Sequence, residues 1–285
     1  MKNIEKETKK IMQKYGIKAD KSLGQNFLID GFAVESIVEA SNISTEDLVI
    51  EIGPGLGTLT DSLLEKAGKV ICVEIDKRMI KILKDRFSEL DNFEIINEDI
   101  LKVDLKSIIQ KEKNENIKNV KIVANLPYYI TTPIIMKLLE DDLDLESITV
   151  MVQKEVAKRL VAIPGTKMAG AITYGVYYYS EAEEIIEVPS TSFIPEPEVT
   201  SEVIKLNIRK EKNNYTKNID LMFKIIKIAF SQRRKTLLNA LINNNIIETK
   251  EQGKEIIEKL NLKENVRGEE LSIEQYAQLC EFINI

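Results

Sequence analysis

The sequence predicts an α/β fold in which a mostly parallel sheet is followed by an all-helical region, and three observations predict it. Residues 48–52 are apolar except for Glu51, as expected for an inner parallel strand, and they run into a glycine-rich turn and a helical pattern. Short apolar runs then alternate with helical patterns at residues 69–74, 93–97, 120–124 and 147–153. Beyond residue 219 the pattern is wholly helical.

The remaining elements follow from periodicity and turn residues. A helix is predicted at residues 131–140, with Thr131 or Thr132 as its N-cap and Pro133 in its first turn. An alternating pair of strands is predicted at residues 183–188 and 202–208. Further helices are predicted at residues 31–40, 58–67, 154–163, 168–179, 219–230, 235–242, 253–260 and 272–283.

Composition narrows the possible chemistry. With 285 residues, 44% of them hydrophobic, the chain is long enough for one large and one small globular domain. It contains two cysteines and no histidine, which excludes a disulfide framework, the common zinc sites and catalysis by imidazole. No apolar run is long enough to cross a bilayer, and the lysine-rich N-terminus lacks the apolar core of a signal peptide. We therefore expect a cytoplasmic protein with neither a membrane segment nor a metal site.

The glycine-rich turn is the first candidate binding site. Gly53, Gly55 and Gly57 stand at alternate positions. Thr58 occupies the place where a dinucleotide-binding fingerprint has its third glycine. Glu51 precedes the first glycine, and a carboxylate there suits a cationic ligand better than a polyanion. The pattern resembles motif I of the class I S-adenosylmethionine (SAM) methyltransferases, with Glu51 orienting the loop; a tight turn without a ligand is the alternative.

Two further acids end the next strands at the same edge of the predicted sheet. Glu74 closes the strand at 69–74, and its carboxylate could accept hydrogen bonds from both hydroxyls of a ribose. Asp99 follows the strand at 93–97 and could accept from an adenine exocyclic amine. Because open α/β sheets bind ligands outside the carboxyl ends of their strands, both acids are predicted to share a cofactor site with the glycine turn. A solvated strand end is the alternative for Glu74.

The tetrapeptide Asn125-Leu126-Pro127-Tyr128 ends the strand at 120–124 and is the candidate catalytic site. The exocyclic amine of an aminopurine is a poor nucleophile, because its lone pair is delocalised into the ring. An asparagine oxygen and a backbone carbonyl of the following turn can each accept an N–H and direct the lone pair toward a methyl donor. Pro127 rigidifies the turn, and Tyr128 offers a ring face on which an extruded base could stack. An Asx-type turn is the alternative.

A second aromatic residue lies in a proline-stiffened loop over residues 190–201. This loop is predicted to present Phe193 beside the ligand edge of the sheet. The alternative is that Phe193 only attaches the loop to the core, which would be the preferred interpretation if Tyr128 were absent.

Two local basic patches are candidates for nucleic-acid contacts, because a net charge of -6 excludes a uniformly positive surface. The N-terminal arm over residues 1–21 is rich in lysine, but a solvated helix face is the simpler interpretation there. The stretch over residues 221–247 contains five basic residues and no acid. Arg233, Arg234 and Lys235 lie at a helix junction within it and suit phosphate contacts, with surface solubility as the alternative.

Together these motifs resemble the KsgA/RsmA family of ribosomal RNA adenine N6,N6-dimethyltransferases, from about Lys18 to the C-terminal helices. The motifs that carry the resemblance are KSLGQNFL, EIGPGLGTLT, VEID, NEDIL, NLPYYITTPI, SFIPEPEV and FSQRRKTLLN. Several of them are individually specific, and their order strengthens the resemblance.

The resemblance implies roles for single residues and for the whole chain. Glu74 would bind the ribose of SAM, Asp99 would bind its adenine, and Asn125 would lie between cofactor and target. The other residues implied to contact SAM are Asn26, Leu28, Gly53 and Gly55. The turn at 125–128 and Phe193 would enclose the target base. The family transfers four methyl groups to two adjacent adenines in the 3′-terminal hairpin loop of small-subunit (16S) rRNA. The expected partner is an assembling ribosomal particle, and the expected enzyme is monomeric and needs no metal.

The expected organisation follows the same resemblance. It comprises a basic N-terminal arm over residues 1–21, a Rossmann-like class I SAM-dependent methyltransferase domain over 22–208, a linker over 209–218 and a small all-helical domain over 219–285. The resemblance also implies a seven-stranded sheet with one antiparallel strand.

The chain departs from the family at Glu198 and Thr200, within a segment that usually reads P-K-V-D-S. A phosphate contact by a lysine there is thus in doubt, and residues 170–173 replace a segment that usually carries Arg and Leu.

Three alternatives remain open. The antibiotic-resistance branch of the superfamily methylates one adenine of large-subunit rRNA, but that branch usually reads N-I-P-Y where this chain has Leu126. DNA adenine methyltransferases typically carry a second proline at that position. A non-catalytic assembly factor could keep the fold and bind RNA through its basic helices, although intact Asn125 and Tyr128 argue against lost chemistry.

Overall fold

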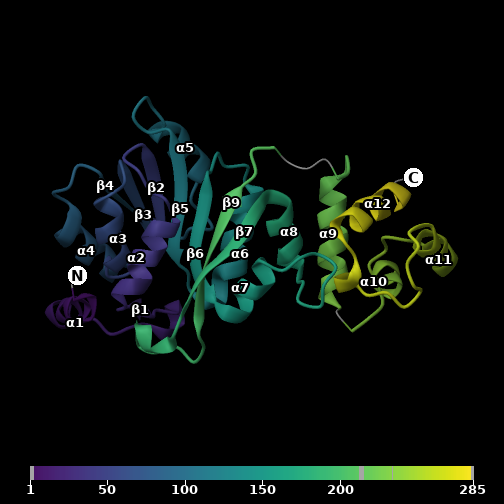
Figure 1. Cartoon of the computed structure of the whole chain (residues 1–285), viewed down its shortest axis with the longest axis horizontal. Coiled ribbons are helices and arrows are strands. Elements are labelled where there is room, and N and C mark those ends of the chain that lie inside the picture. Colours follow the sequence, from purple (N-terminus) through teal and green to yellow (C-terminus); the bar gives the residue numbers. More distant parts are fainter. Residues whose placement is uncertain (1–2, 212–214, 233, 284–285) are drawn as a thin grey trace. The chain divides into compact units, whose positions relative to one another are not determined.

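The computed structural model describes residues 3–211, 215–232 and 234–283. They fold into two compact units (Figure 1). The first unit contains the chain up to Ala157 together with residues 181–208. The second unit contains residues 158–180 and the chain from Arg209 onward. Each unit has an apolar core, and each is described by itself.

In the described part of the chain, the first unit is built on a seven-stranded sheet in the order β4-β3-β2-β5-β6-β9-β7 (Figure 1). Its strands are β2 (Asp47–Ile52), β3 (Lys69–Glu74), β4 (Phe93–Asn97), β5 (Asn119–Asn125), β6 (Ser147–Gln153), β7 (Ser180–Val188) and β9 (Ser201–Ile208). The strands from β4 to β6 pair in parallel, and β9 runs antiparallel to β6. The predicted α/β sheet is confirmed, and the parallel strands end at one common edge.

A small second sheet brings two distant segments together. β1 (Phe27–Leu28) pairs antiparallel with β8 (Phe193–Ile194), so that the Cα atom of Leu28 lies opposite that of Phe193. The Oγ of Ser192 donates to the Oδ2 of Asp30 at 2.7 Å and extends the contact. The loop before β9 is therefore attached to the segment that precedes the first βαβ unit.

Three helices of the first unit begin at an aspartate that caps them. The helices are α1 (Ile4–Tyr15), α2 (Gly31–Ala40), α3 (Thr58–Leu64), α4 (Lys77–Phe87), α5 (Leu105–Glu112), α6 (Thr131–Glu140) and the start of α7 (Lys154–Leu160). Asp30, Asp76 and Asp104 each accept a backbone N–H from the first turn of α2, α4 and α5. These caps satisfy amides that would otherwise lack a partner at a helix start.

The predicted cap of α6 is wrong. Thr131 already has helical dihedral angles, φ -53° and ψ -53°, and Ile130 holds the N-cap position without a side-chain hydrogen bond. The Oγ1 of Thr131 donates to the carbonyl of Pro127 at 3.2 Å. The reason is the short turn at Tyr128–Ile130, which delivers the chain into α6 one residue earlier than a threonine cap requires.

The N-terminal helix α1 packs on the first unit through its apolar side. Ile4, Ile11 and Met12 are partly buried against the core of this unit. The carboxylate of Glu7 pairs with the guanidinium of Arg86 on α4 at 3.2 Å. Its lysines are exposed, as the interpretation of a solvated helix face predicts: Lys6, Lys9, Lys10 and Lys14.

The described part of the second unit is helical. It contains the end of α7 and α8 (Ala171–Tyr179), α9 (Ile219–Ser231), α10 (Leu237–Asn243), α11 (Lys250–Lys259) and α12 (Ile273–Ile283). Tyr174 and Tyr178 of α8 are buried in its core, and the Oη of Tyr174 donates to the carbonyl of Leu271 at 2.6 Å. Residues 158–180 therefore belong to this unit, whereas the sequence placed them in the Rossmann-like domain. The apolar side of α8 finds its partners among helices much later in the chain.

Residues 3–211, 215–232 and 234–283 contain neither a candidate membrane span nor a candidate metal cluster. None of the helices there is both long enough and apolar enough to span a bilayer. Within the same residues, no group of three or more cysteine, aspartate or glutamate side chains is placed to hold a metal ion.

Candidate active site

A cavity opens at the carboxyl ends of the parallel strands in the first unit. Its empty space, with the solvent at its open mouth included, is about 1220 Å³. Residues 23–28, the glycine turn after β2, the ends of β3 and β4 and the turn after β5 line it. The lining includes these predicted site residues: Asn26, Leu28, Glu51, Gly53, Gly55, Glu74, Asp99, Asn125, Leu126, Pro127 and Tyr128.

The glycine turn needs its glycines for two reasons. Gly53, Gly55 and Gly57 all have positive φ angles, of 67°, 56° and 80°. A Cβ atom at Gly57 would also lie 2.7 Å from a ring carbon of Phe87, so α4 packs against the bare backbone there. A Cβ at Gly53, in contrast, would meet no heavy atom of the described residues within 4 Å, apart from its chain neighbours. The backbone at Gly53 therefore faces free space in the cavity.

Glu74 is held in place by the backbone around it. Its Oε2 accepts from the N–H of Gly55 at 3.2 Å, and its Oε1 accepts from the N–H of Asp76 at 2.8 Å. Burial raises the pKa of this carboxyl, although these hydrogen bonds act in the opposite direction. The side chain thus links the end of β3 to the glycine turn. Asp99 lies nearby in the lining, and its Oδ1 accepts from the N–H of Leu101 at 3.0 Å.

Glu51 lies beneath the turn and holds it to α3. Its side chain is 2% exposed, and its Oε2 accepts from the Oγ1 of Thr60 at 2.6 Å. The Sγ of Cys72 donates to the same oxygen at 3.4 Å. Burial raises the pKa of Glu51 to about 7. Near neutral pH this carboxyl is only partly ionised, which weakens the prediction that it attracts a cation through a full negative charge.

Asn125 is oriented by a segment far from it in the sequence. Its Nδ2 donates to the backbone carbonyl of Asn26 at 3.2 Å. An amide donates only through its nitrogen, so this contact defines where the Oδ1 acceptor points. The N–H of Leu126 donates to the carbonyl of Met151 at 3.1 Å and keeps the turn attached to β6.

Tyr128, at the end of the Asn125–Tyr128 turn, is hydrogen-bonded to the start of β9. Its Oη and the Oγ of Ser201, the first residue of β9, lie 2.6 Å apart in a hydrogen bond. Burial raises the pKa of this phenol, with the Ser201 hydrogen bond acting against it. Tyr128 lines the cavity, so this hydrogen bond holds the hydroxyl end of an aromatic side chain in place at the site.

Comparison with known proteins shows the family of the chain. The model of the family described as ribosomal RNA adenine dimethylase matches residues 16–284. The chain belongs to this family of enzymes. It is 48% identical over 277 residues to the ribosomal RNA small subunit methyltransferase A of Clostridioides difficile, covering 97% of this chain and 95% of that protein. The protein of the same name from Alkaliphilus metalliredigens is 50% identical and covers 95% of this chain and 94% of that one.

Solved structures agree with this membership in the dimethylase family. A dimethyladenosine transferase from Plasmodium falciparum aligns with a TM-score of 0.72 at 27% identity, covering 90% of this chain and 97% of that chain. The 23S rRNA methyltransferase ErmE aligns with a TM-score of 0.65 at 24% identity, covering 91% of this chain and 100% of that one. The second likeness shows the shared fold.

Phe193 does not take the place that the sequence predicted for it in this dimethylase-family chain. Its side chain is 1% exposed and belongs to the core cluster of the first unit, and it is absent from the described lining of the cavity. The pairing of β8 with β1 sets Phe193 opposite Leu28, and both side chains belong to this core cluster. The alternative interpretation, in which Phe193 attaches its loop to the core, describes this conformation.

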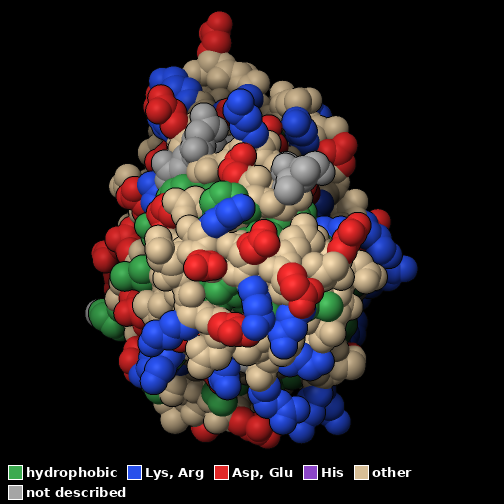
Figure 2. All heavy atoms as spheres, turned by 90° about the vertical axis from the view of Figure 1, so that its right-hand side faces the viewer, with side chains coloured by type: hydrophobic (Ala, Val, Ile, Leu, Met, Phe, Trp, Pro, Cys, Tyr) green, Lys and Arg blue, Asp and Glu red, His purple; other side chains and the backbone are tan. Residues whose placement is uncertain are grey.

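The predicted phosphate contacts lie in the second unit. Arg233 falls outside the described residues. Arg234 and Lys235 are exposed between α9 and α10. Figure 2 shows no uniformly basic face in its view, because Lys and Arg side chains alternate with Asp and Glu. Any attraction to RNA on the face shown would therefore be local, as the net charge predicted.

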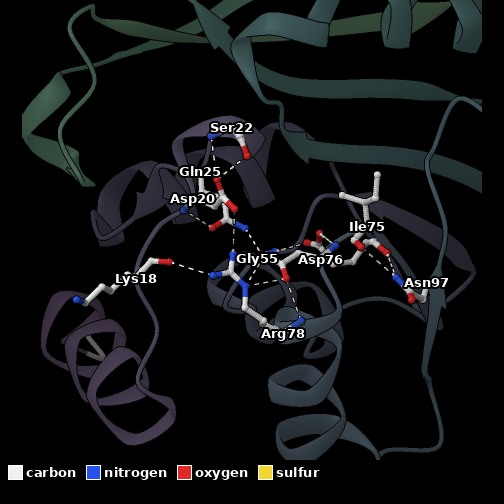
Figure 3. Close-up of polar contacts among 10 residues, drawn as sticks. Lys18, Asp20, Ser22, Gln25, Gly55, Ile75, Asp76, Arg78 and Asn97 are labelled. Carbon is white, nitrogen blue, oxygen red and sulfur yellow. Dashed lines mark hydrogen bonds and ion pairs between the residues drawn. The ribbon is translucent and has the colours of Figure 1, made fainter.

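Sequence reasoning missed the residues that connect the parts of the dimethylase site. Gln25 and Asp76 form a hydrogen bond next to the cavity, and Arg78 pairs with Asp76 (Figure 3). The exposed ring of Tyr129 lies over Gly24, where a Cβ atom would be 3.2 Å from it. The motifs that contain Gln25 and Asp76 can be recognised in the sequence. The contact between these two residues cannot be predicted from their separation along the chain.

Proposed function

We propose that this enzyme transfers methyl groups from SAM to N6 of adenines in small-subunit rRNA, dimethylating two adjacent adenines of the 3′-terminal hairpin loop. The names of the relatives from Clostridioides difficile and Alkaliphilus metalliredigens support the small subunit as the source of the substrate. Leu126 supports the same choice, since the large-subunit branch usually has isoleucine there. The enzyme would act as a monomer on an assembling particle in the cytoplasm.

The residues that line the cavity fit SAM. Gly53 offers an open stretch of backbone for the methionine part, and the fixed carboxylate of Glu74 can accept from both ribose hydroxyls. Asp99 can accept from the adenine amine, with Asn26 and Leu28 closing the other side. When bound, SAM supplies an electrophilic methyl group on a sulfonium. The proposed chemistry assigns no step to a metal ion.

Asn125 and the turn after it prepare the amine for attack. With its Nδ2 engaged by the Asn26 carbonyl, Asn125 directs Oδ1 as an acceptor for one N6–H of the target adenine. A backbone carbonyl of the turn would accept the other N–H, which holds the lone pair toward the methyl donor. Tyr128 would stack on the extruded base, with its hydroxyl end held by Ser201. No strong base is required, because the amine loses its proton only after the methyl group has been transferred.

One observation carries the proposal: the glycine turn and the Asn125–Tyr128 turn line the same cavity. The test is mass analysis of rRNA fragments after incubation of small-subunit particles with SAM, with naked large-subunit RNA as the competing substrate. We expect a gain of two methyl groups on each of two adjacent adenines of the small-subunit hairpin. Asn125→Ala should abolish the gain while particle binding persists.

Two outcomes would contradict the proposal. Methylation of large-subunit RNA alone would favour the antibiotic-resistance type of activity. Equal particle binding by the wild-type and Asn125→Ala proteins, without methyl transfer by either, would favour a non-catalytic assembly factor.

A further inference from the structure

The segment between α1 and β1 is held onto the first βαβ unit by a side-chain hydrogen bond at the rim of the cavity. The Nε2 of Gln25 donates to the Oδ2 of Asp76 at 2.8 Å, and the Oε1 of Gln25 accepts from the N–H of Asp20 at 2.9 Å (Figure 3). One amide thus bridges its own loop and the start of α4. Because both polar ends of Gln25 are engaged, its side chain has a single orientation.

Asp76 is the fixed partner in this bridge. It is 7% exposed, and its carboxylate also accepts from the Nη2 of Arg78 at 2.6 Å. The Nη2 of Arg78 in turn lies 3.8 Å from the Oδ2 of Asp20, and its Nη1 donates to the carbonyl of Lys18 at 3.4 Å (Figure 3). The loop is therefore attached to the start of α4 at two residues, the N-cap Asp76 and Arg78 in the first turn.

The bridge ends at the two functional parts of the cavity. Through its N–H, Asp76 donates to the Oε1 of Glu74, the predicted ribose acceptor, at 2.8 Å. Next to Gln25, the carbonyl of Asn26 accepts from the Nδ2 of Asn125 at 3.2 Å. A continuous path of contacts consequently joins the cofactor end of the site to the amide that would orient the target base.

We propose that Gln25 and Asp76 are positioning residues that set the orientation of Asn125, through the backbone carbonyl of Asn26. This inference rests on the proposed role of Asn125 as the acceptor of an N6–H. The bridge holds residue 26 in place, and residue 26 selects which end of the Asn125 amide faces the adenine. Its loss allows the amide to rotate and to present a donor where an acceptor is required.

The test exchanges the donor and the acceptor of the bridge. Gln25→Glu places two carboxylates against each other, so we expect the kcat of methyl transfer to fall about 10- to 100-fold, the range seen for misplaced catalytic groups. Asp76→Asn in the same protein restores one N–H···O contact with its direction reversed, and kcat should recover to within about threefold. Ser22→Ala is the matched control: its hydroxyl bonds Asp20 on the same loop at 2.6 Å, and kcat should be unchanged.

A second measurement reads the amide directly. The side-chain amide signal of Asn125, assigned by its loss in Asn125→Asp, is recorded in protein labelled with ¹⁵N at asparagine. We expect Gln25→Glu to shift this signal and the double variant to restore it. This readout requires no methyl transfer, so an inactive wild-type enzyme would contradict the proposed function while the spectra still decide the present inference.

Three results would overturn the inference. The first is an unshifted Asn125 signal in Gln25→Glu, and the second is a double variant as impaired as the single one. The third is a loss confined to the KM for SAM with kcat unchanged, since this would make the bridge part of cofactor binding alone.

Discussion

At the scale of single residues, the site depends on side chains whose charge and orientation are set by burial. Glu51 lies between the turn and α3 with a pKa raised by burial to about 7. Tyr128 and Asn125 each reach the cavity with one polar group already engaged, by Ser201 and Asn26. Prior engagement reduces the freedom that these groups would lose on binding a base.

The first prediction concerns Glu51 and pH. Between pH 4.5 and about 7 the folded protein keeps a proton on Glu51 that the unfolded chain has lost. The free energy of unfolding therefore declines as the pH rises through this window, by on the order of 3 kcal/mol. Glu51→Gln cannot ionise and keeps an acceptor for Thr60. Its free energy of unfolding, relative to wild type, should rise between pH 5 and pH 8 in urea titrations.

The exposed Glu89 provides the control for this prediction. Glu89→Gln should show the same difference from wild type at both pH values. If Glu51→Gln also differs from wild type by a constant amount, the raised pKa is refuted.

The second prediction concerns the hydrogen bond between Tyr128 and Ser201. Tyr128→Phe keeps the ring but loses this bond, and Ser201→Ala removes the same bond from the other side. Each change should lower kcat/KM for particles roughly two- to tenfold, which corresponds to a loss of about 0.5–1.5 kcal/mol of transition-state stabilisation. In the double variant the two losses should not add, because one interaction is removed in both cases. Fully additive losses in steady-state kinetics would show that the two side chains act independently.

At the scale of elements, buried charge at the start of the strands stabilises the sheet that carries the site. Asp47 begins β2 and Lys121 lies in β5, both are buried, and their Oδ2 and Nζ atoms lie 2.8 Å apart. Burial disfavours ionisation, but hydrogen bonds from Lys121, Ser44 and Asn119 lower the pKa of Asp47 overall. The pair joins two strands whose opposite ends carry Glu51 and Asn125.

The third prediction follows from this pair. Lys121→Met should lower the free energy of unfolding by roughly 3–5 kcal/mol at pH 7, because a buried carboxylate is left without its cation. Lys118→Met is the matched control, since Lys118 pairs with Glu46 on the surface with both side chains about half exposed. That change should cost less than about 1 kcal/mol. Equal losses in urea unfolding would show that the buried pair contributes no more than a surface pair.

At the scale of the whole molecule, the predicted site residues are divided between two units. The cavity and its predicted site residues belong to the first unit, whereas Arg234 and Lys235 belong to the second. Because the net charge is negative, we propose that these side chains contact phosphates locally. RNA affinity and methyl transfer should then respond to separate substitutions.

The fourth prediction tests this separation. Arg234→Ala and Lys235→Ala should each weaken particle binding and lower the slope of log Kd against log salt concentration by about one. Affinity for SAM should not change in calorimetric titrations. Lys254→Ala is the control, because Lys254 pairs with Glu264 at 2.8 Å within the same unit. An unchanged salt slope, or a loss of SAM binding, would show that this patch has another role.

Local patterns were sufficient for most of the fold. The strand at 69–74, the strand at 147–153 and the helix at 131–140 were predicted with the boundaries that the structure has. Apolar runs and turn residues determine structure through contacts between near neighbours in the chain, so these elements can be predicted from the sequence. The glycine turn and the acids at the strand ends could likewise be predicted, because parallel pairing brings strand ends to one edge.

Contacts between segments far apart in the chain could not be predicted from the sequence. The burial of Phe193 depends on the pairing of β8 with β1, and the grouping of α8 depends on helices near the C-terminus. The hydrogen bond from Asn125 to Asn26 joins residues 99 positions apart. The sequence by itself determined the sheet, the glycine turn and the types of polar group at the site, since these depend on local periodicity. Only the tertiary structure decided which groups meet and which way each faces, because packing selects among partners that local patterns leave equivalent.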